Sequence, residues 1–116
     1  MTDTVRIYHN PRCSKSRETL ALLRDRGVEP TVVEYLKAPP TRKEIERLIE
    51  MLGGDPHVLV RAKEPAYKVS GLSKTSSSRE VAAAVAAEPV LLERPIVVKA
   101  GKAAIGRPPE SVLDIL

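Results

Sequence analysis

The hydrophobic pattern near the start of the chain changes from a period of two residues to a helical period. Val5 and Ile7 alternate with polar residues, which indicates a strand, and the Asn-Pro pair that follows indicates a turn. From Ser14 onward leucines recur at helical spacing until Gly27, a typical residue for a helix end. The next apolar stretch, TVVEYL, is rich in β-branched residues. This part of the chain therefore predicts a strand, helix, strand unit with two parallel strands.

The middle of the chain has a helical pattern. Thr41 with Glu44 and Ser77 with Glu80 each spell a capping box. The first box precedes a stripe of isoleucines and leucines, and the second precedes an alanine-rich run that a proline ends. Both runs predict helices, whereas the polar residues 62–76 predict no regular element.

The last third of the chain returns to strand patterns. Apolar residues on both sides of Ala100 and Gly101 predict a β-hairpin, and Pro108 and Pro109 suit the first turn of a final helix. The whole pattern predicts an α/β domain over residues 1–116, with a mixed, roughly four-stranded sheet flanked by helices and a helical insertion at about 41–90. A chain of 116 residues is expected to build one core.

Composition excludes several classes of function. The net charge of +4 is spread along the chain, and three Tyr without Phe or Trp argue against a nucleic-acid platform. The chain has no 18-residue apolar run, and its start lacks the pattern of a signal peptide, so we expect a cytoplasmic protein away from membranes. One cysteine and two histidines cannot complete a tetrahedral zinc site. We therefore expect no metal and no bound cofactor.

The one cysteine, Cys13, is predicted to lie where the first strand ends and the first helix begins. Unpaired backbone N–H groups and the positive end of the helix dipole would then point at its sulfur and stabilise a thiolate. Ser16, three residues on, can donate a further hydrogen bond to the sulfur. Neighbouring basic residues are the setting that lowers a thiol pKa from about 8.5 toward roughly 3.5–7.5. These residues are His9, Arg12, Lys15 and Arg17.

Each of these residues also has a structural interpretation. A lone cysteine more often packs in a core than reacts, but Cys13 stands among Asn, Pro, Arg, Ser and Lys rather than in an apolar run. Its location therefore favours a reactive thiol. His9 is as compatible with a strand-end residue bonded to the backbone as with tuning of Cys13. Arg12 and Lys15 are as compatible with solvated surface charges.

Four separated motifs resemble, in the same order, the glutaredoxin-linked arsenate reductase family of bacteria. They are YHNPRCSKSRETL, RAKEPAYKVSGL, ERPIVV and IGRPPESVLDIL, and together they span nearly the whole chain. The resemblance implies a thioredoxin-like fold with a helical insertion. It also implies that Pro95, within ERPIVV, is the cis-proline that such folds place beside the active cysteine.

The same resemblance implies a reaction and its residues. Cys13 would attack arsenate, glutathione would act as co-substrate, and glutaredoxin would resolve the mixed disulfide, with the protein acting as a monomer. The positions that match the family's anion-binding arginines are Arg61, Arg94 and Arg107, while His9, Ser16 and Arg17 match positions near the thiolate. Arginine suits this task because it screens the repulsion between thiolate and dianion and binds oxyanions bidentately. Without the motif match, three surface salt bridges would be the ordinary interpretation of these arginines.

Two features resemble a shorter chromosomal branch of this family, for which arsenate is a less certain substrate. The chain stops directly after VLDIL, and Ser14 and Lys15 follow Cys13 where the resistance-operon enzymes carry smaller, neutral residues.

Three alternative functions can be compared with this sequence. A redox regulator that binds RNA polymerase commonly uses C-x-x-C, whereas this chain has C-x-x-S. A phosphatase-like C-x5-R loop is absent because Thr19 stands at the arginine position. A thiol oxidoreductase acting on glutathione mixed disulfides would need only Cys13, Ser16 and Pro95, and it stays open beside arsenate reduction.

Overall fold

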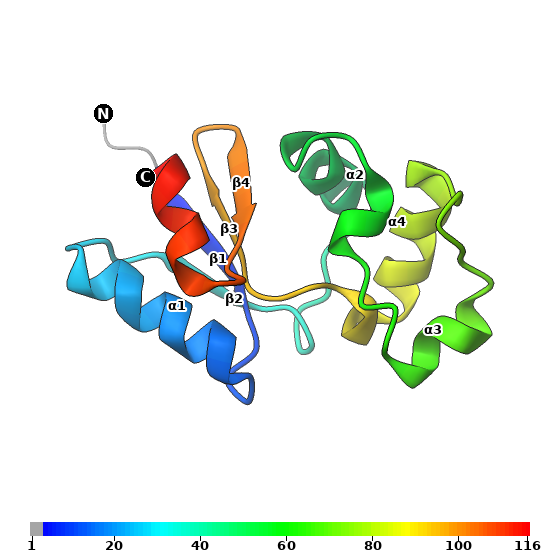
Figure 1. The fold of residues 1–116 in the computed structure, drawn as a ribbon, viewed down its shortest axis with the longest axis horizontal. Coiled ribbons are helices and arrows are strands. Elements are labelled where there is room, and N and C mark those ends of the chain that lie inside the picture. The colour runs from blue at the N-terminus through cyan, green and yellow to red at the C-terminus, as the bar shows by residue number, and fades with distance from the viewer. Residues whose placement is uncertain (1–3) are drawn as a thin grey trace. The chain divides into compact units, whose positions relative to one another are not determined.

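Four strands form one mixed sheet in the computed structural model, which describes residues 4–116 (Figure 1). The strands are β1 (Val5–His9), β2 (Thr31–Glu34), β3 (Ile96–Lys99) and β4 (Lys102–Ile105), in the order β2-β1-β3-β4. β1 pairs with β2 in parallel, whereas the β1–β3 and β3–β4 pairs are antiparallel. The predicted mixed four-stranded sheet, with its parallel first pair and its final hairpin, is therefore confirmed.

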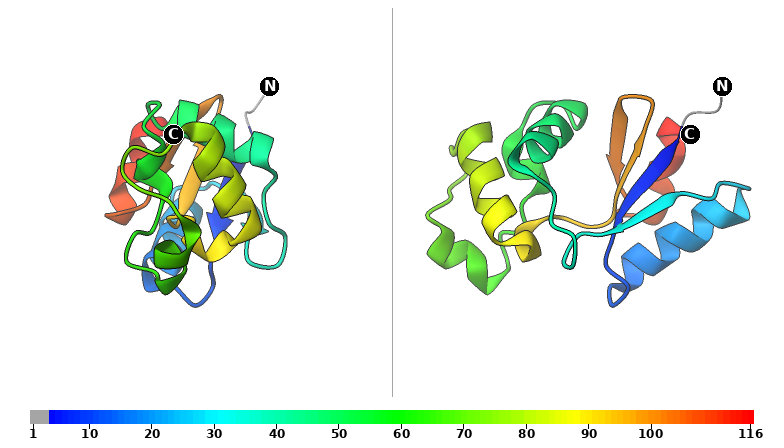
Figure 2. Two further views of the ribbon diagram at one scale, coloured as in Figure 1. Left: turned by 90° about the vertical axis from the view of Figure 1, so that its right-hand side faces the viewer. Right: turned by 180° about the vertical axis from the view of Figure 1, so that it is seen from behind.

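Helical segments connect these strands along the chain (Figure 2). The α-helices are α1 (Ser14–Asp25), α2 (Arg42–Met51), α3 (Pro65–Ser70) and α4 (Ser78–Ala87), and the 3₁₀ segments are η1 (Pro56–Leu59), η2 (Pro89–Leu91) and η3 (Pro109–Ile115). Both predicted capping boxes form at the starts of α2 and α4. No helix within residues 4–116 is long and apolar enough to cross a membrane.

Two local predictions need correction. Residues 62–76 were predicted to hold no regular element, but α3 forms there, with Pro65 in its first turn and Gly71 in the left-handed conformation after its last residue. The final segment was predicted to be a helix, but Pro109–Ile115 forms a 3₁₀ helix. Its proline-rich start is compatible with either form, so the sequence pattern alone did not distinguish the two.

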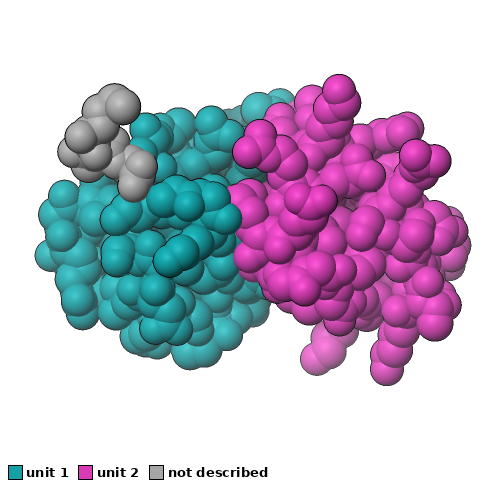
Figure 3. Space-filling view, turned by 90° about the horizontal axis from the view of Figure 1, so that it is seen from above, with its two compact units in different colours: residues 1–38, 94–116 teal, residues 39–93 magenta. Residues whose placement is uncertain are grey.

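The chain divides into two compact units (Figure 3). The first unit takes in the chain up to residue 38 together with residues 94–116, and the second is residues 39–93. The predicted helical insertion at about 41–90 lies within the second unit. There α2 packs against α4. Of the stripe predicted for this helix, Ile45, Leu48 and Ile49 are fully buried, while Leu52 is partly buried just after α2. Val81 and Val85 of α4 are also fully buried.

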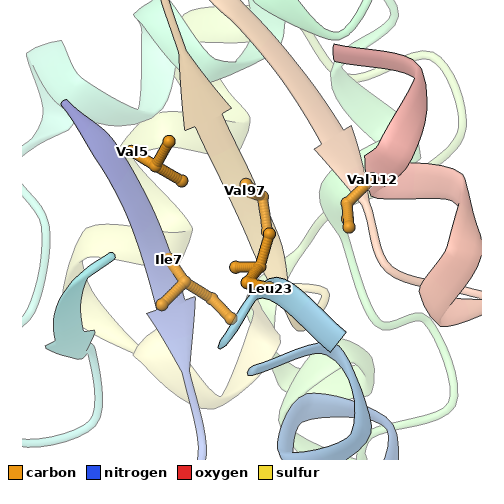
Figure 4. Packing of buried hydrophobic residues seen from close by; sticks show 5 residues of the cluster. All are labelled: Val5, Ile7, Leu23, Val97 and Val112. Carbon is orange, nitrogen blue, oxygen red and sulfur yellow. The ribbon is translucent and has the colours of Figure 1, made fainter. Parts of the chain in front are cut away.

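The first unit is organised around one face of the sheet (Figure 4). Val5 and Ile7 are two positions apart on β1, so both point to the same face, where Val97 of β3 joins them. Leu23 of α1 and Val112 of η3 cover this face. The packing fixes α1 against the end of β1, and the start of α1 is the position of Cys13.

Candidate active site

Cys13 lies at the N-terminus of α1, directly after a tight turn. Its backbone N–H donates to the carbonyl of Asn10 at 3.0 Å, and its own carbonyl accepts from the N–H of Arg17 at 3.0 Å. The side chain of Asn10 is nearly buried and accepts from the N–H of Arg12 at 3.0 Å. The turn is thus closed by main-chain and side-chain bonds, and it leaves the Cys13 thiol partly exposed at the start of the helix.

Two arginines from distant parts of the chain meet Cys13. Nη2 of Arg107 lies 3.7 Å from Sγ of Cys13, and the side chain of Arg94 also hydrogen-bonds to this thiol. Nε of Arg107 donates to the carbonyl oxygen of Arg94 at 2.9 Å. Each arginine precedes a cis peptide bond, to Pro95 and Pro108 respectively. The structure therefore places two guanidinium groups and one thiol in a single cluster.

The surroundings lower the pKa of the Cys13 thiol below its ordinary value of 9.0. Partial burial acts in the opposite direction and would raise this pKa, but the groups that favour the thiolate outweigh it. They are, in order, the backbone N–H of Ser16, the hydrogen bond and charge of Arg94, and the backbone N–H of Lys15. The Cys13 sulfur accepts no N-cap hydrogen bond. The backbone N–H groups of Ser16 and Lys15 nevertheless lie close enough to stabilise negative charge on this sulfur.

The sequence suggested that the Ser16 hydroxyl donates a hydrogen bond to the Cys13 sulfur, but this hydroxyl has other partners. Its oxygen accepts from the N–H of Asn10 at 3.0 Å and shares a 2.6 Å hydrogen bond with Nδ1 of His9. The hydroxyl is therefore engaged by the turn, and Ser16 acts on Cys13 through its backbone N–H instead. A buried serine at this position fixes the turn and the first helical N–H groups together.

His9 was as compatible with a strand-end residue as with tuning of Cys13, and its surroundings favour the neutral form of its imidazole. Burial lowers the pKa of His9, and the charges of Arg24 and Arg17 lower it further, against the opposing effect of Glu34. A lowered pKa keeps the imidazole neutral at neutral pH, so it brings no positive charge to the thiolate. Its contact with Ser16 makes His9 a residue that holds the turn.

The other basic residues near Cys13 have local partners. Nη1 of Arg17 donates to the carbonyl of Pro11 at 3.0 Å, which clamps the turn from the first turn of α1. Lys15 forms an exposed ion pair with Glu18 at 3.7 Å. None of the side chains of Arg12, Lys15 and Arg17 is among the groups that lower the pKa of Cys13.

Arg61 lies in the second unit, apart in the chain from the cluster described above. Its guanidinium forms ion pairs with Glu64 at 3.3 Å and with Glu93 at 3.4 Å, and all three side chains are about four-fifths buried, with 22% exposed. The structure thus assigns Arg61 two carboxylate partners within its own unit. Its role as an anion ligand stays a prediction.

Two residues of the cluster were not singled out from the sequence. Tyr35 is fully buried directly after β2, and its phenol interacts with the side chain of Arg94 and favours the protonated form of that guanidinium. Gly106 packs so tightly that an added Cβ would lie 2.5 Å from Oγ1 of Thr19 and 2.8 Å from Cγ of Pro95. For Tyr35 the sequence holds a weak signal. A tyrosine that follows an apolar strand is expected to be buried, and a buried phenol needs a polar partner.

The cluster has the parts needed for nucleophilic chemistry on an anion. A thiol with a lowered pKa supplies the nucleophile, and two guanidinium groups beside it can accept an oxyanion. Within residues 4–116, no group of three His, Cys, Asp or Glu side chains is placed to hold a metal ion.

Known proteins resemble this chain over its full length. A protein of Escherichia coli (strain K12) named "Uncharacterized protein YfgD" is 52% identical, and the match covers 100% of this chain and 99% of that protein. An arsenate reductase of Haemophilus influenzae is 44% identical over 97% of this chain and 99% of its own length. The solved structure of an arsenate reductase from Vibrio cholerae superimposes with a TM-score of 0.93 at 48% identity and covers 100% of both chains.

The fold agrees with the same assignment. The mixed four-stranded sheet with its flanking helices matches these arsenate reductase structures, which have a thioredoxin-like fold. Residues 8–115 match the model of the ArsC family, and this range holds Cys13, Arg94 and Arg107. The thiol and both cis-proline junctions lie inside the matched range, and the chain belongs to the ArsC family.

Proposed function

We propose that this protein is an arsenate reductase that uses glutathione and glutaredoxin as its source of electrons. The observation that carries the proposal is the meeting of Arg94 and Arg107 at the Cys13 thiol, because Arg107 is 94 positions away in the chain and still comes within 3.7 Å of Sγ. The similarity to arsenate reductases at 44% and 48% identity supports arsenate as the substrate.

Electrostatics explains why arginines are needed at this thiol. Arsenate carries about two negative charges near neutral pH, and a thiolate adds a third, so the two reactants repel each other. Arg94 remains protonated, since its contacts with Cys13 and Tyr35 raise its pKa more than burial lowers it. Two guanidinium groups can bind the arsenate oxygens by charged hydrogen bonds and orient the arsenic toward the sulfur.

The reaction begins with attack of the Cys13 thiolate on arsenic. A sulfur–arsenic bond forms while one arsenic–oxygen bond breaks, and the oxygen leaves as water after protonation, so arsenic stays pentavalent. The glutathione thiolate then attacks Sγ of Cys13, and the electron pair of the sulfur–arsenic bond passes to arsenic, which leaves as trivalent arsenite. Arsenic thereby gains two electrons, and the thiols of Cys13 and glutathione lose them as they form the new disulfide.

Glutaredoxin closes the cycle by thiol–disulfide exchange at the Cys13–glutathione disulfide. An external thiol is required because Cys13 is the only cysteine of this chain. Dependence on reduced glutathione also fits the reducing conditions of the cytoplasm, where we place the protein. We further propose that it acts as a monomer.

A coupled assay with arsenate, glutathione and glutaredoxin tests the proposal. We expect arsenate-dependent turnover in the unchanged protein, and no turnover in Cys13→Ser or Arg94→Ala. Arg79→Ala serves as the matched control, because Arg79 is exposed on α4 and belongs to the other unit. Unchanged arsenate turnover in Arg94→Ala would remove support for the anion site. It would favour the thiol oxidoreductase alternative instead.

A further inference from the structure

A pocket of about 250 Å³ opens beside the turn that carries Cys13. One wall is the turn itself, from His9 to Arg12, and the other is the segment from Glu34 to Lys37 after β2. β1 and β2 are parallel, and His9 pairs with Glu34 at their ends, so the pocket lies at the carboxyl edge of a parallel pair. Ligands of open α/β sheets commonly bind at this edge.

The pocket has a defined charge pattern around an apolar surface. Arg12 and Lys37 bring two positive charges, and Glu34, whose carboxylate lies 3.7 Å from Nζ of Lys37, brings one negative charge. Pro11 and Leu36 supply apolar surface, and Leu36 is 48% exposed. Neither Arg94 nor Arg107 lines this pocket, so its positive charges are separate from those beside Sγ.

We propose that this pocket binds the peptide part of glutathione and delivers its thiol to Cys13. The inference rests on the proposed function and names the site of its co-substrate. Glutathione carries two carboxylates and one ammonium group at neutral pH. The pocket offers the complementary set, with two cations for the carboxylates and Glu34 for the ammonium group.

The position and size of the pocket support the same occupant. Arg12 directly precedes Cys13, and the hydrogen bond from Cys13 N–H to Asn10 closes the turn that forms the pocket wall. A ligand seated against this turn therefore lies next to the sulfur that it must reach. The volume is slightly below the range of about 300–1,000 Å³ for small-molecule sites, which suits part of a tripeptide rather than a segment of a folded partner.

Exchange with oxidised glutathione tests the pocket without arsenate. In this step the Cys13 thiolate attacks one sulfur of oxidised glutathione, a Cys13–glutathione disulfide forms, and one glutathione thiolate leaves. We expect Lys37→Glu to slow this exchange about three- to tenfold, since an exposed attraction becomes a repulsion. The rate with the uncharged bis(2-hydroxyethyl) disulfide should stay unchanged, because this disulfide carries no carboxylates. Lys102→Glu, an equal charge change at an exposed position of β4, should alter neither rate.

A direct binding measurement covers the case in which Lys37→Glu also disturbs the local fold. S-methylglutathione cannot react, and in a nuclear magnetic resonance titration we expect it to shift the amides of residues 10–12 and 34–37. Equal slowing of both disulfides, no change in either rate, or shifts confined to other residues would each overturn the proposal. If Lys37→Glu slows only the exchange with oxidised glutathione and the unchanged protein shows no arsenate turnover, the proposed function is refuted. The glutathione site would still stand.

Discussion

Arg107 fixes the backbone of Arg94 through the 2.9 Å bond from its Nε to the Arg94 carbonyl oxygen. The same guanidinium reaches Sγ of Cys13 through Nη2 at 3.7 Å. One arginine therefore ties together the thiol and the second arginine. The two guanidinium groups differ in weight, because the hydrogen bond and charge of Arg94 are among the main causes that lower the pKa of Cys13, whereas Arg107 contacts Sγ only at 3.7 Å.

This difference predicts distinct effects of two equal substitutions. Arg94→Ala should raise the pKa of the Cys13 thiol, and Arg107→Ala should raise it by a smaller amount, because a positive charge 3.7 Å from the sulfur also favours the thiolate. The pH dependence of alkylation of Cys13 by iodoacetamide measures both values, since only the thiolate reacts. Arg107→Lys keeps the positive charge, but a lysine cannot contact both the Arg94 carbonyl oxygen and the Cys13 sulfur as the guanidinium does. An equal rise in the pKa for Arg94→Ala and Arg107→Ala would contradict the assignment.

The lowered pKa of Cys13 also predicts a pH dependence of stability. In the unfolded chain the thiol has its ordinary pKa of 9.0, and in the folded protein its pKa is lower. The stabilisation by the thiolate is therefore complete above the unfolded value and is lost as the pH falls through the folded value. Urea unfolding from neutral pH upward should show the unchanged protein gaining stability relative to Cys13→Ser. A difference between the two proteins that stays constant with pH would refute this linkage.

Tyr35 is expected to position Arg94 rather than to react. Tyr35→Phe keeps the buried ring and removes the hydroxyl that favours the protonated Arg94 guanidinium. Loss of this polar contact should let Arg94 move from its position, so we expect kcat/KM for arsenate to fall several-fold. The pKa of Cys13 should rise as well, a change that a purely structural role would not produce. Tyr67→Phe, which removes a hydroxyl bonded to His57 in the second unit, is the matched control and should leave this pKa unchanged.

Gly106 is predicted to be sensitive because it has no room for a side chain. Gly106→Ala would force Thr19 or Pro95 to move, and overpacking of this kind costs about 1–3 kcal/mol of stability. Since Arg107 follows Gly106, the guanidinium should shift away from Sγ, and KM for arsenate should rise. Thr19→Ala in the same protein removes the closest contact and should restore part of the stability measured by urea unfolding. No recovery in the double variant would mean that Pro95 alone is the obstacle.

The sequence predicted the elements whose signals are local. The pairs Thr41 with Glu44 and Ser77 with Glu80 act within four residues, and both capping boxes form as expected. The hairpin turn is equally local, since Ala100 and Gly101 both have positive φ angles, of 52° and 78°. Such features depend little on the rest of the fold.

The parts of the site that sequence reasoning missed depend on tertiary contacts. Within the stretch TVVEYL, Tyr35 looks like one more apolar strand residue, and only the fold brings its phenol to Arg94. The protonation of His9 also follows from burial, which a single sequence does not reveal. Likewise, the Ser16 hydroxyl finds its partners in His9 and Asn10 because β1 and α1 meet at the turn. The motif resemblance implied positions, whereas the atoms that make these contacts are set by the tertiary fold.

Arg61 offers the last test, because its two carboxylate partners compete with any anion. If Arg61 binds arsenate, an oxyanion must draw the guanidinium away from Glu64 and Glu93, which hold it at 3.3 and 3.4 Å. Glu93→Gln removes one competitor and should lower KM for arsenate several-fold while kcat changes little. Glu88→Gln makes the same charge change at an exposed position nearby in the chain and controls for general electrostatics. An equal effect of both substitutions on KM, or no effect of Glu93→Gln, would contradict a role of Arg61 in arsenate binding. Arg61 would then have a structural role only, as the central member of a partly buried ion-pair network.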